Sequence, residues 1–393
     1  MVPGVFYGPT ARRRAVPDTD NRETLMDRRS FITKAGIGAA ATGVAATTLA
    51  TPALSQNVKE MAIVSTWPRD FPGLGLPAQR LAARITELTD GRINTTYYAA
   101  GERVGAFDSF DNVTSGESQA YIGADYYWKG KHPAWAAYTA IPFGLTYTEI
   151  DAWIKFGGGQ ELWDELANEF GLQNFAMGNT GVQMGGWFNK EIESADDLKG
   201  LKMRIPGLGG DVMAKLGASP VSLPGGQIYE NLVSGSIDAT EWVGPYNDYF
   251  MKFYEAAKYY YYPGMHEPGS QLAIGINKAF WDSISKNDQE IMKAAFNEEN
   301  AKTMAETNAN NGAYLQRLIN DHGVELREFN DDIYDSFGEA SEEVLEEAMA
   351  HSPLAKKTFE AVIAARKELG GWSRISDTAY TIQRNRVLGI DEG

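Results

Sequence analysis

The chain of 393 residues contains no cysteine. This absence excludes disulfide bonds, thiolate metal sites and cysteine nucleophiles. Histidine is also scarce, and no two histidines have the i, i+4 spacing with which a helix holds a metal ion. The four are His132, His266, His322 and His351. The sequence therefore offers few side chains that could act as the base of an enzyme.

Basic residues are few relative to acidic ones. The chain has 36 Lys and Arg against 52 Asp and Glu, a formal charge of −16. Seven of the basic and four of the acidic residues precede residue 56, so the remainder carries a charge of −19. We therefore expect no nucleic-acid partner, because binding a phosphate backbone requires a basic surface. After residue 55, no apolar run reaches the roughly 18 residues of a membrane-spanning helix.

The amino terminus has the organisation of an export signal. The twin arginines Arg28 and Arg29 precede a weakly apolar run over 35–50, and small residues then provide a cleavage site that ends a leader of residues 1–55. This pattern is typical of a Tat-type signal peptide, so we expect export to the periplasm by the Tat route. A membrane-tethered helix is the alternative, although the run is shorter than the ~20 residues of a span. The residues before Met26 indicate either an upstream-start artefact or a disordered tail.

After the leader, the chain alternates short strands with amphipathic helices. The first unit consists of a strand at 60–67, a helix at 79–88 and a strand at 92–98. The second consists of a strand at 201–205, a helix at 210–216, a strand at 219–223 and a helix at 228–234. This order indicates an α/β fold with largely parallel sheets, and two such units fit two lobes around a cleft.

Three further stretches are helical in pattern: 287–322, 335–370 and 378–388. No low-complexity linker separates the two units. We therefore expect short hinge segments, which allow lobes to close on a ligand.

Arg204 is the strongest single candidate for ligand binding. It lies at the end of a predicted strand, where open α/β sheets place ligands, and its guanidinium is a permanently charged fork that matches a carboxylate. A solvated strand-end arginine is the alternative on position alone. The glycine-rich stretch 207–210 lacks the order and the lysine of a nucleotide loop, but free N–H groups at a helix start also suit an anion.

A loop with an acid and a large aromatic residue is expected at 235–245. Glu241 and Trp242 stand there among small residues and before Gly-Pro, a composition that disfavours a helix or strand. Tyrosines at 259–262 and a second acid, Glu267, follow. Packing in the core or at a hinge is the alternative role for these tyrosines.

Several segments together resemble the solute-binding proteins of TRAP transporters, the DctP-like family. The segments are TWP at 66–68, FPGLG at 71–75, DDLKGLKMRIP at 196–206, LPGGQIY at 223–229 and IDATEWVGP at 237–245. The likeness covers nearly all of residues 57–375 and is greatest to the subgroup that binds 2-oxo or 2-hydroxy monocarboxylates, such as pyruvate or lactate, with a metal ion.

The resemblance implies a two-lobed periplasmic binding protein (type II-like) with hinge strands, a long interlobe helix and a C-terminal helical extension. On this basis we assign 56–179 plus 268–307 to lobe I and 180–267 plus 308–340 to lobe II. The C-terminal helical extension is then 341–393.

The resemblance also implies which residues form the site. The arginine matching Arg204 pairs with the substrate carboxylate. A cation bridges ligand and protein, and its matching ligands are Gln183, Glu241, the backbone carbonyl of Trp242, and Glu267. A glutamate at the last position favours calcium over sodium.

Further ligand contacts are implied for Tyr127 and Asn179, beside Gln183 and Trp242. A physical argument supports the cation independently. Two carboxylates near an anionic substrate would each repel it by ~4 kcal/mol at 4 Å and an effective dielectric near 20. A bound cation reverses that repulsion, and oxygen ligands suit calcium or sodium.

The implied partners are a small organic acid and the membrane permease subunits of a TRAP transporter. In the similar subgroup the C-terminal extension is exchanged between two subunits, so we expect a homodimer; a helix folded back on its own chain is the alternative. A periplasmic enzyme acting on organic acids is the rival function. Its base would have to come from His266 beside Glu267.

Overall fold

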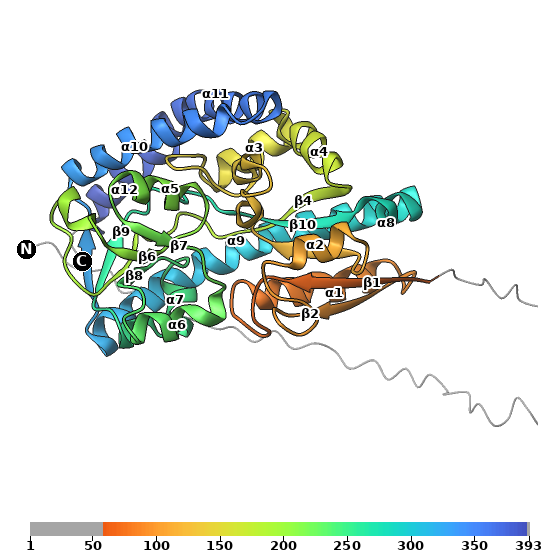
Figure 1. Ribbon diagram of the computed structural model, residues 1–393, viewed down its shortest axis with the longest axis horizontal. Coiled ribbons are helices and arrows are strands. Elements are labelled where there is room, and N and C mark those ends of the chain that lie inside the picture. Colours follow the sequence, from red (N-terminus) through yellow and green to blue (C-terminus); the bar gives the residue numbers. More distant parts are fainter. Residues whose placement is uncertain (1–57, 391–393) are drawn as a thin grey trace, which may run out of the picture. The chain divides into compact units, whose positions relative to one another are not determined.

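The computed structural model describes residues 58–390 (Figure 1). The predicted leader at 1–55, with its Tat-type signal, lies outside the described residues. Among the helices that are described, none is both long and apolar enough to cross a membrane. The described chain contains two β-sheets with helices packed around them.

The first sheet has five strands in the order β2-β1-β3-β10-β4. They are β1 (Lys59–Ser65), β2 (Ile93–Tyr98), β3 (Ala120–Gly123), β4 (Leu172–Asn179) and β10 (Gln271–Asn277). β1 pairs in parallel with β2 and β3, whereas β10 runs antiparallel between β3 and β4. α1 (Gly75–Leu88) joins β1 to β2 and buries Leu81, Ala82 and Ile85 on one face. The predicted strand, helix and strand are confirmed, although the helix begins at Gly75 and not at residue 79.

The second sheet has six strands in the order β11-β9-β5-β8-β6-β7. They are β5 (Gly186–Phe188), β6 (Lys202–Arg204), β7 (Ser219–Val221), β8 (Ala239–Thr240), β9 (Tyr259–Tyr262) and β11 (Glu325–Glu328). β6 pairs in parallel with β7 and β8, and β5 pairs antiparallel with β8 and β9, so the sheet is mixed. The prediction of a loop throughout 235–245 is wrong at β8. Ala239 pairs there with both Phe188 and Met203, and pairing on both sides outweighs weak local propensity.

Two helices beside the second sheet begin at glycines, three residues before their predicted starts. They are α5 (Gly207–Lys215) and α6 (Gly225–Val233). Glycine is a poor helix former, but close packing requires it here. A Cβ at Gly209 would lie 2.6 Å from the Cβ of His266, and a Cβ at Gly225 would lie 2.5 Å from the ring of Trp242.

The long helix α9 (Lys286–His322) confirms the helix predicted at 287–322. Ser285 caps its start by accepting a hydrogen bond from the N–H of Asp288, and Gly323 ends it with a φ of 66°. Figure 1 shows α9 running between the two sheets. It contacts α1 and β4 of the first and α7 (Pro245–Met251) beside the second. α9 therefore has the place of the predicted interlobe helix.

The helical stretch predicted at 335–370 consists of two helices, α10 (Asp331–Met349) and α11 (Pro353–Ile375). The break occurs because Ser352 caps the start of α11 and Pro353 occupies its first position. α10 packs on α5, and α11 packs on α3 (Tyr147–Phe156) and α4 (Gly159–Glu169). α12 (Asp377–Leu388) follows and contains no buried residue.

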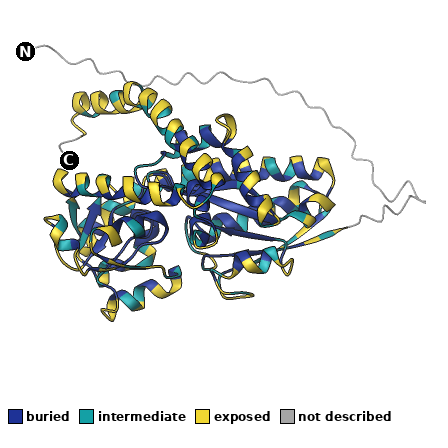
Figure 2. Cartoon of the chain, turned by 45° about the horizontal axis from the view of Figure 1, so that its top comes forward, coloured by how far each residue is buried: buried dark blue, intermediate teal, exposed yellow. Residues whose placement is uncertain are grey.

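The remaining helical segments are short. They are α2 (Ser109–Thr114), α8 (Lys278–Ser283) and 3-10 turns at Asp125–Trp128, Pro133–Tyr138, Ala195–Leu198 and Phe253–Glu255. Figure 2 shows buried residues gathered in the strands and on the inner faces of the helices. The first sheet takes its strands from 59–179 and 271–277, and the second from 186–262 and 325–328. This division follows the predicted lobes, whose boundaries stay a prediction.

Candidate ligand-binding site

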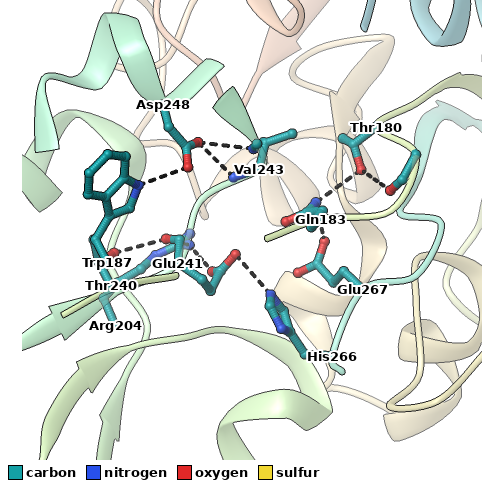
Figure 3. A network of polar contacts seen from close by, with 12 residues as sticks. Thr180, Gln183, Trp187, Arg204, Thr240, Glu241, Val243, Asp248, His266 and Glu267 are labelled. Atoms are coloured by element: carbon teal, nitrogen blue, oxygen red, sulfur yellow. Dashed lines mark hydrogen bonds and ion pairs between the residues drawn. The ribbon is translucent and has the colours of Figure 1, made fainter. Parts of the chain in front are cut away.

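Four segments of the chain meet at one buried place (Figure 3). Arg204 ends β6, and Glu241 follows β8, which pairs with β6 so that Arg204 is opposite Thr240. Gln183 lies between β4 and β5, and Glu267 lies between β9 and β10. Both of these connections cross from one sheet to the other. The site therefore forms where the chain passes between the two sheets.

Arg204 is buried, with 1% of its surface exposed, which excludes the solvated alternative. Its Nη1 donates to the backbone carbonyl of Glu241 at 3.0 Å and also contacts the Glu241 carboxylate, while its Nε donates to the carbonyl of Leu223 at 3.2 Å. The guanidinium carbon lies 5.1 Å from the ring centroid of Trp242. Within residues 58–390, Nη2 makes none of these hydrogen bonds, so one nitrogen of the fork is left for a ligand.

Glu241 is fully buried between the side chains of Arg204 and His266. Its Oε1 contacts Arg204, and its Oε2 lies 3.3 Å from Nε2 of His266. Burial by itself lowers the pKa of His266, but the hydrogen bond and the charge of Glu241 outweigh it and raise that pKa above its ordinary value. The carboxylate is therefore stabilised from two sides.

Glu267 and Gln183 form the other half of the site. Nε2 of Gln183 donates to Oε2 of Glu267 at 2.7 Å and to the hydroxyl of Thr180 at 3.0 Å. Burial, followed by the charge of Glu241, raises the pKa of Glu267 to about 7. Oε1 of Gln183 and Oε1 of Glu267 are buried and have no hydrogen-bond partner among the described residues. Such unpaired acceptors are costly, so both oxygens fit a ligand that supplies positive charge.

The groups gathered here suit a hard cation. Glu241, His266 and Glu267 each offer one possible ligand atom, and these atoms lie within 4.8 Å of one another. Gln183 adds an amide oxygen beside Glu267. Carboxylate and amide oxygens are the ligands preferred by calcium and other hard ions, whereas imidazole and thiolate favour zinc. The single imidazole of the cluster hydrogen-bonds to Glu241.

A small cavity adjoins these groups. Its walls come from segments of both sheets: Trp67, Leu74, Ala124, Tyr126, Tyr127, Thr180, Gln183, Trp242, Val243, Ser270 and Leu272. The Nε1–H of Trp242 is buried and has no acceptor within the described chain. A wall of aromatic and aliphatic side chains that also carries a few unpaired polar groups is typical of a site for a small organic molecule.

The two weaker candidates, Tyr127 and Asn179, lie in different surroundings. Tyr127 lines the cavity, and burial raises the pKa of its phenol. The buried side chain of Asn179 bonds within the chain, where its Oδ1 accepts from the N–H of Gly181 at 2.8 Å and its Nδ2 donates to the carbonyl of Gly269 at 3.3 Å. Asn179 is therefore positioned to hold the connection that leaves β4. A ligand contact remains a prediction for both residues.

The sequence did not predict a ligand-binding role for two residues that the structure places at the site. The sequence indicates His266 only as the base of the rival enzyme, whereas the structure places it against Glu241. Trp67 lines the cavity although no role is predicted for it. Signals for both were present, because His266 precedes Glu267 and Trp67 belongs to the TWP segment.

Comparison with known proteins gives a consistent result. The family model of the bacterial extracellular solute-binding proteins, family 7 (DctP), matches residues 64–352. A monocarboxylate 2-oxoacid-binding periplasmic protein of Nostoc sp. is 39% identical over 359 residues, which cover 90% of this chain and 98% of that protein. The sialic acid-binding periplasmic protein SiaP of Vibrio cholerae is 25% identical over 224 residues, 56% of this chain and 67% of its own.

Solved structures of TRAP periplasmic solute-binding proteins are similar over most of the chain. The protein of Pseudoalteromonas atlantica, with bound sodium and pyruvate, has a TM-score of 0.80, 37% identity and coverage of 82% of this chain and 98% of its own. The protein of Colwellia psychrerythraea, with bound calcium and pyruvate, has a TM-score of 0.80, 37% identity and coverage of 83% and 99%. A Bordetella bronchiseptica dimer with copurified calcium and picolinate in one active site has a TM-score of 0.83, 32% identity and coverage of 85% and 99%. The predicted two-lobed α/β fold is confirmed.

Proposed function

Because this chain belongs to the bacterial extracellular solute-binding proteins of family 7, the DctP family, we propose that it is the extracytoplasmic receptor of a TRAP transporter. Its ligand is a small 2-oxo or 2-hydroxy monocarboxylate such as pyruvate or lactate. The observation that supports this most is the grouping of buried Arg204, Glu241 and Glu267. They lie beside Gln183 and Trp242, which line a small cavity. The family resemblance inferred from the sequence is confirmed.

Arg204 binds the carboxylate of the acid. Its guanidinium is held by Glu241 and Leu223, so little conformational freedom is lost when a ligand binds. A second donor is the Nε1–H of Trp242, which has no acceptor among the described residues. Tyr127 and Asn179 complete the proposed ligand contacts.

A calcium or sodium ion bridges the ligand to Gln183, Glu241, the backbone carbonyl of Trp242, and Glu267. When bound, the ion supplies the positive charge that allows two carboxylates and an organic anion to share one site. The residues present fit such an ion, because Gln183 and Glu267 each direct an unpaired buried oxygen to the site. Two acidic ligands favour calcium over sodium. The relatives from Colwellia and Pseudoalteromonas contain calcium and sodium respectively, each with pyruvate.

The protein acts by binding and release and performs no chemistry on its ligand. The family is one of transport receptors, and the rival periplasmic enzyme lacks support. A base would need access to the substrate, whereas Nε2 of His266 is occupied by Glu241.

Delivery of the acid requires the permease subunits of a TRAP transporter as partners, in agreement with the family's extracytoplasmic location. The leader at 1–55 directs export to the periplasm by the Tat route. Lobe I at 56–179 plus 268–307 and lobe II at 180–267 plus 308–340 close on the ligand.

The protein is a homodimer in this proposal. The extension at 341–393 includes α12 and the end of α11, where large apolar side chains are exposed. They are Trp372, Ile375, Tyr380, Ile382, Val387, Leu388 and Ile390. Exposed apolar residues so close together favour a partner, and the Bordetella relative is a dimer.

Isothermal titration calorimetry with three acids tests the proposed ligand class. Pyruvate and lactate should bind to the calcium-loaded protein with a stoichiometry of one per chain. Propionate has the same number of carbons but lacks the 2-oxygen, and it should bind at least about tenfold more weakly, a difference of about 1.4 kcal/mol. Failure of all three acids to bind would contradict the proposal, and appearance of a product by NMR would favour the enzyme.

A further inference from the structure

A buried carboxylate outside the ligand cavity lies directly behind the proposed metal-binding loop. Asp248, on α7, has 1% of its surface exposed. Its Oδ1 accepts hydrogen bonds from the backbone N–H groups of Val243 and Gly244, both at 3.1 Å. Its Oδ2 accepts from Nε1 of Trp187 at 2.9 Å and from the hydroxyl of Tyr260 at 2.7 Å. Four donors therefore converge on one side chain, and Figure 3 shows the contacts of Asp248 with Trp187 and Val243.

The backbone donors belong to the loop that carries the site. Val243 and Gly244 directly follow Trp242, whose carbonyl is a proposed metal ligand. The carbonyl of Val243 in turn accepts a hydrogen bond from the N–H of Met184 at 3.0 Å, one residue after Gln183. The carboxylate of Asp248 thus binds the segment after Trp242 directly. It is connected to the segment after Gln183 through the peptide unit between Val243 and Gly244.

The side-chain donors belong to the second sheet. Trp187 of β5 and Tyr260 of β9 are directly paired, and their rings stack with centroids 4.0 Å apart. Both side chains are fully buried. Paired strands and stacked rings form a rigid support. Asp248 therefore joins a loop that has no regular structure of its own to two buried, stacked side chains of the sheet.

The residue before Asp248 contacts the loop that joins the first strand of the first sheet to its helix. Asn247, the neighbour of Asp248 on α7, donates from Nδ2 to the carbonyl of Pro72 at 2.7 Å. Pro72 lies in the loop between β1 and α1. The same helix therefore orients the metal-binding loop and contacts the opposite side of the site.

We propose that Asp248 is a positioning residue for cation and acid binding, which holds 241–244 so that the Glu241 carboxylate and the Trp242 carbonyl face Gln183. This inference rests on the proposed receptor function and adds a residue that does not touch the ligand. The carboxyl group of Asp248 is buried, so water cannot replace a donor that is lost. Loss of one donor therefore weakens the hold of Asp248 on the loop.

Two neighbouring tyrosines provide a matched test. Tyr260→Phe removes one donor from Asp248. Tyr261→Phe removes the hydroxyl of the next residue on the same strand, which is also a buried residue but bonds the backbone of Ile192, away from the site. Calcium affinity in the presence of pyruvate is measured by calorimetry well below the melting temperature, so that only folded protein contributes. We expect Tyr260→Phe to weaken calcium binding about tenfold and Tyr261→Phe to change it by less than about twofold.

Asp248→Asn is the second variant, because its amide nitrogen cannot accept from two donors. It should weaken calcium binding by more than Tyr260→Phe does; if it does not fold, the tyrosine pair decides. The inference would be overturned if Tyr260→Phe bound calcium as tightly as the wild type while both tyrosine variants had equally lowered melting temperatures. Asp248 would then stabilise the fold without positioning the metal-binding loop. Wild-type protein that binds neither calcium nor pyruvate would overturn the receptor proposal as well.

Discussion

Arg204 and Glu241 are joined through both side chain and backbone inside the protein, because Nη1 of Arg204 contacts the backbone carbonyl and the side-chain carboxylate of Glu241. The parallel pairing of β6 with β8 places the two residues together, and the N–H of Glu241 also donates to the carbonyl of Arg204 at 3.1 Å. A buried charge pair of this kind is strongly destabilised when one partner is lost. The same pair therefore contributes to the fold and prepares the site.

Replacing Arg204 by lysine tests the role of the guanidinium fork. The variant keeps the positive charge near Glu241 but loses the directed hydrogen bonds, so pyruvate should bind about 10- to 100-fold more weakly. Calorimetry on the calcium-loaded protein measures the effect. Arg92→Lys is the control, because Arg92 pairs with Asp288 and Asp90 away from the site and its variant should bind normally. Equal pyruvate affinity in the two variants would argue against Arg204 as the anchor.

Removing the metal tests the bridge. Protein treated with a chelator should bind pyruvate at least about tenfold more weakly, because Glu241 and Glu267 then repel the anion without compensation. Adding calcium back should restore the affinity, and adding magnesium should restore less of it, because magnesium requires stricter octahedral geometry. An unchanged pyruvate affinity after chelation would contradict a bridging ion.

Replacing Glu267 by glutamine tests its role as an acidic ligand. The amide keeps an oxygen at the site but removes one negative charge, so calcium affinity should fall by more than about tenfold while sodium affinity changes less. Glu149→Gln is a matched control, because Glu149 is also buried but accepts hydrogen bonds from Thr146 and Ser373 outside the site. If both variants lower calcium affinity equally, the effect is one of general stability.

Asp125 predicts a pH dependence of stability that is separate from the site. It accepts hydrogen bonds from Tyr121, Trp163 and Asn174, and burial raises its pKa from 3.8 to about 7. Between pH 3.8 and about 7, Asp125 is deprotonated in the unfolded chain but still protonated in the folded chain. The free energy of unfolding that this group contributes therefore falls as the pH rises and is lost above pH about 7. Asn at this position does not titrate.

Urea denaturation of wild type and Asp125→Asn at several pH values measures this effect. The stability of the variant relative to wild type should rise by at most about 4 kcal/mol between pH about 4 and about 7. Asp335→Asn, at an exposed position on α10, should follow the wild type across the same range. Parallel curves for wild type and Asp125→Asn would contradict a raised pKa at Asp125.

Deleting residues 377–393 tests the homodimer. The full chain should give the mass of two copies in light scattering, and the truncated chain the mass of one, because α12 exposes Tyr380 and Val387 at 68% each. Pyruvate binding should survive truncation, since α12 buries no residue of its own. A monomeric mass for the full chain would reject the dimer and favour a helix folded back on its own chain.

Helix boundaries show how far local sequence signals reach. The long helix was predictable to within one residue at its start, because Ser285 and Gly323 are strong local signals for a helix start and end. The starts of α5 and α6 were not predictable. Their glycines are poor helix formers, and the reason for them lies in the close approach of His266 and Trp242, which are distant in sequence.

The sequence by itself determined the α/β class, the family and the identity of the charged candidates Arg204, Glu241 and Glu267, because these depend on periodicity, composition and contiguous motifs. Only the tertiary structure decided which atoms remain free to bind. That His266 supports Glu241, that Asn179 bonds within the chain, and that oxygens of Gln183 and Glu267 lack partners depends on contacts between segments up to 90 residues apart. Hydrogen-bond satisfaction is a property of the folded neighbourhood, so no local pattern reveals it.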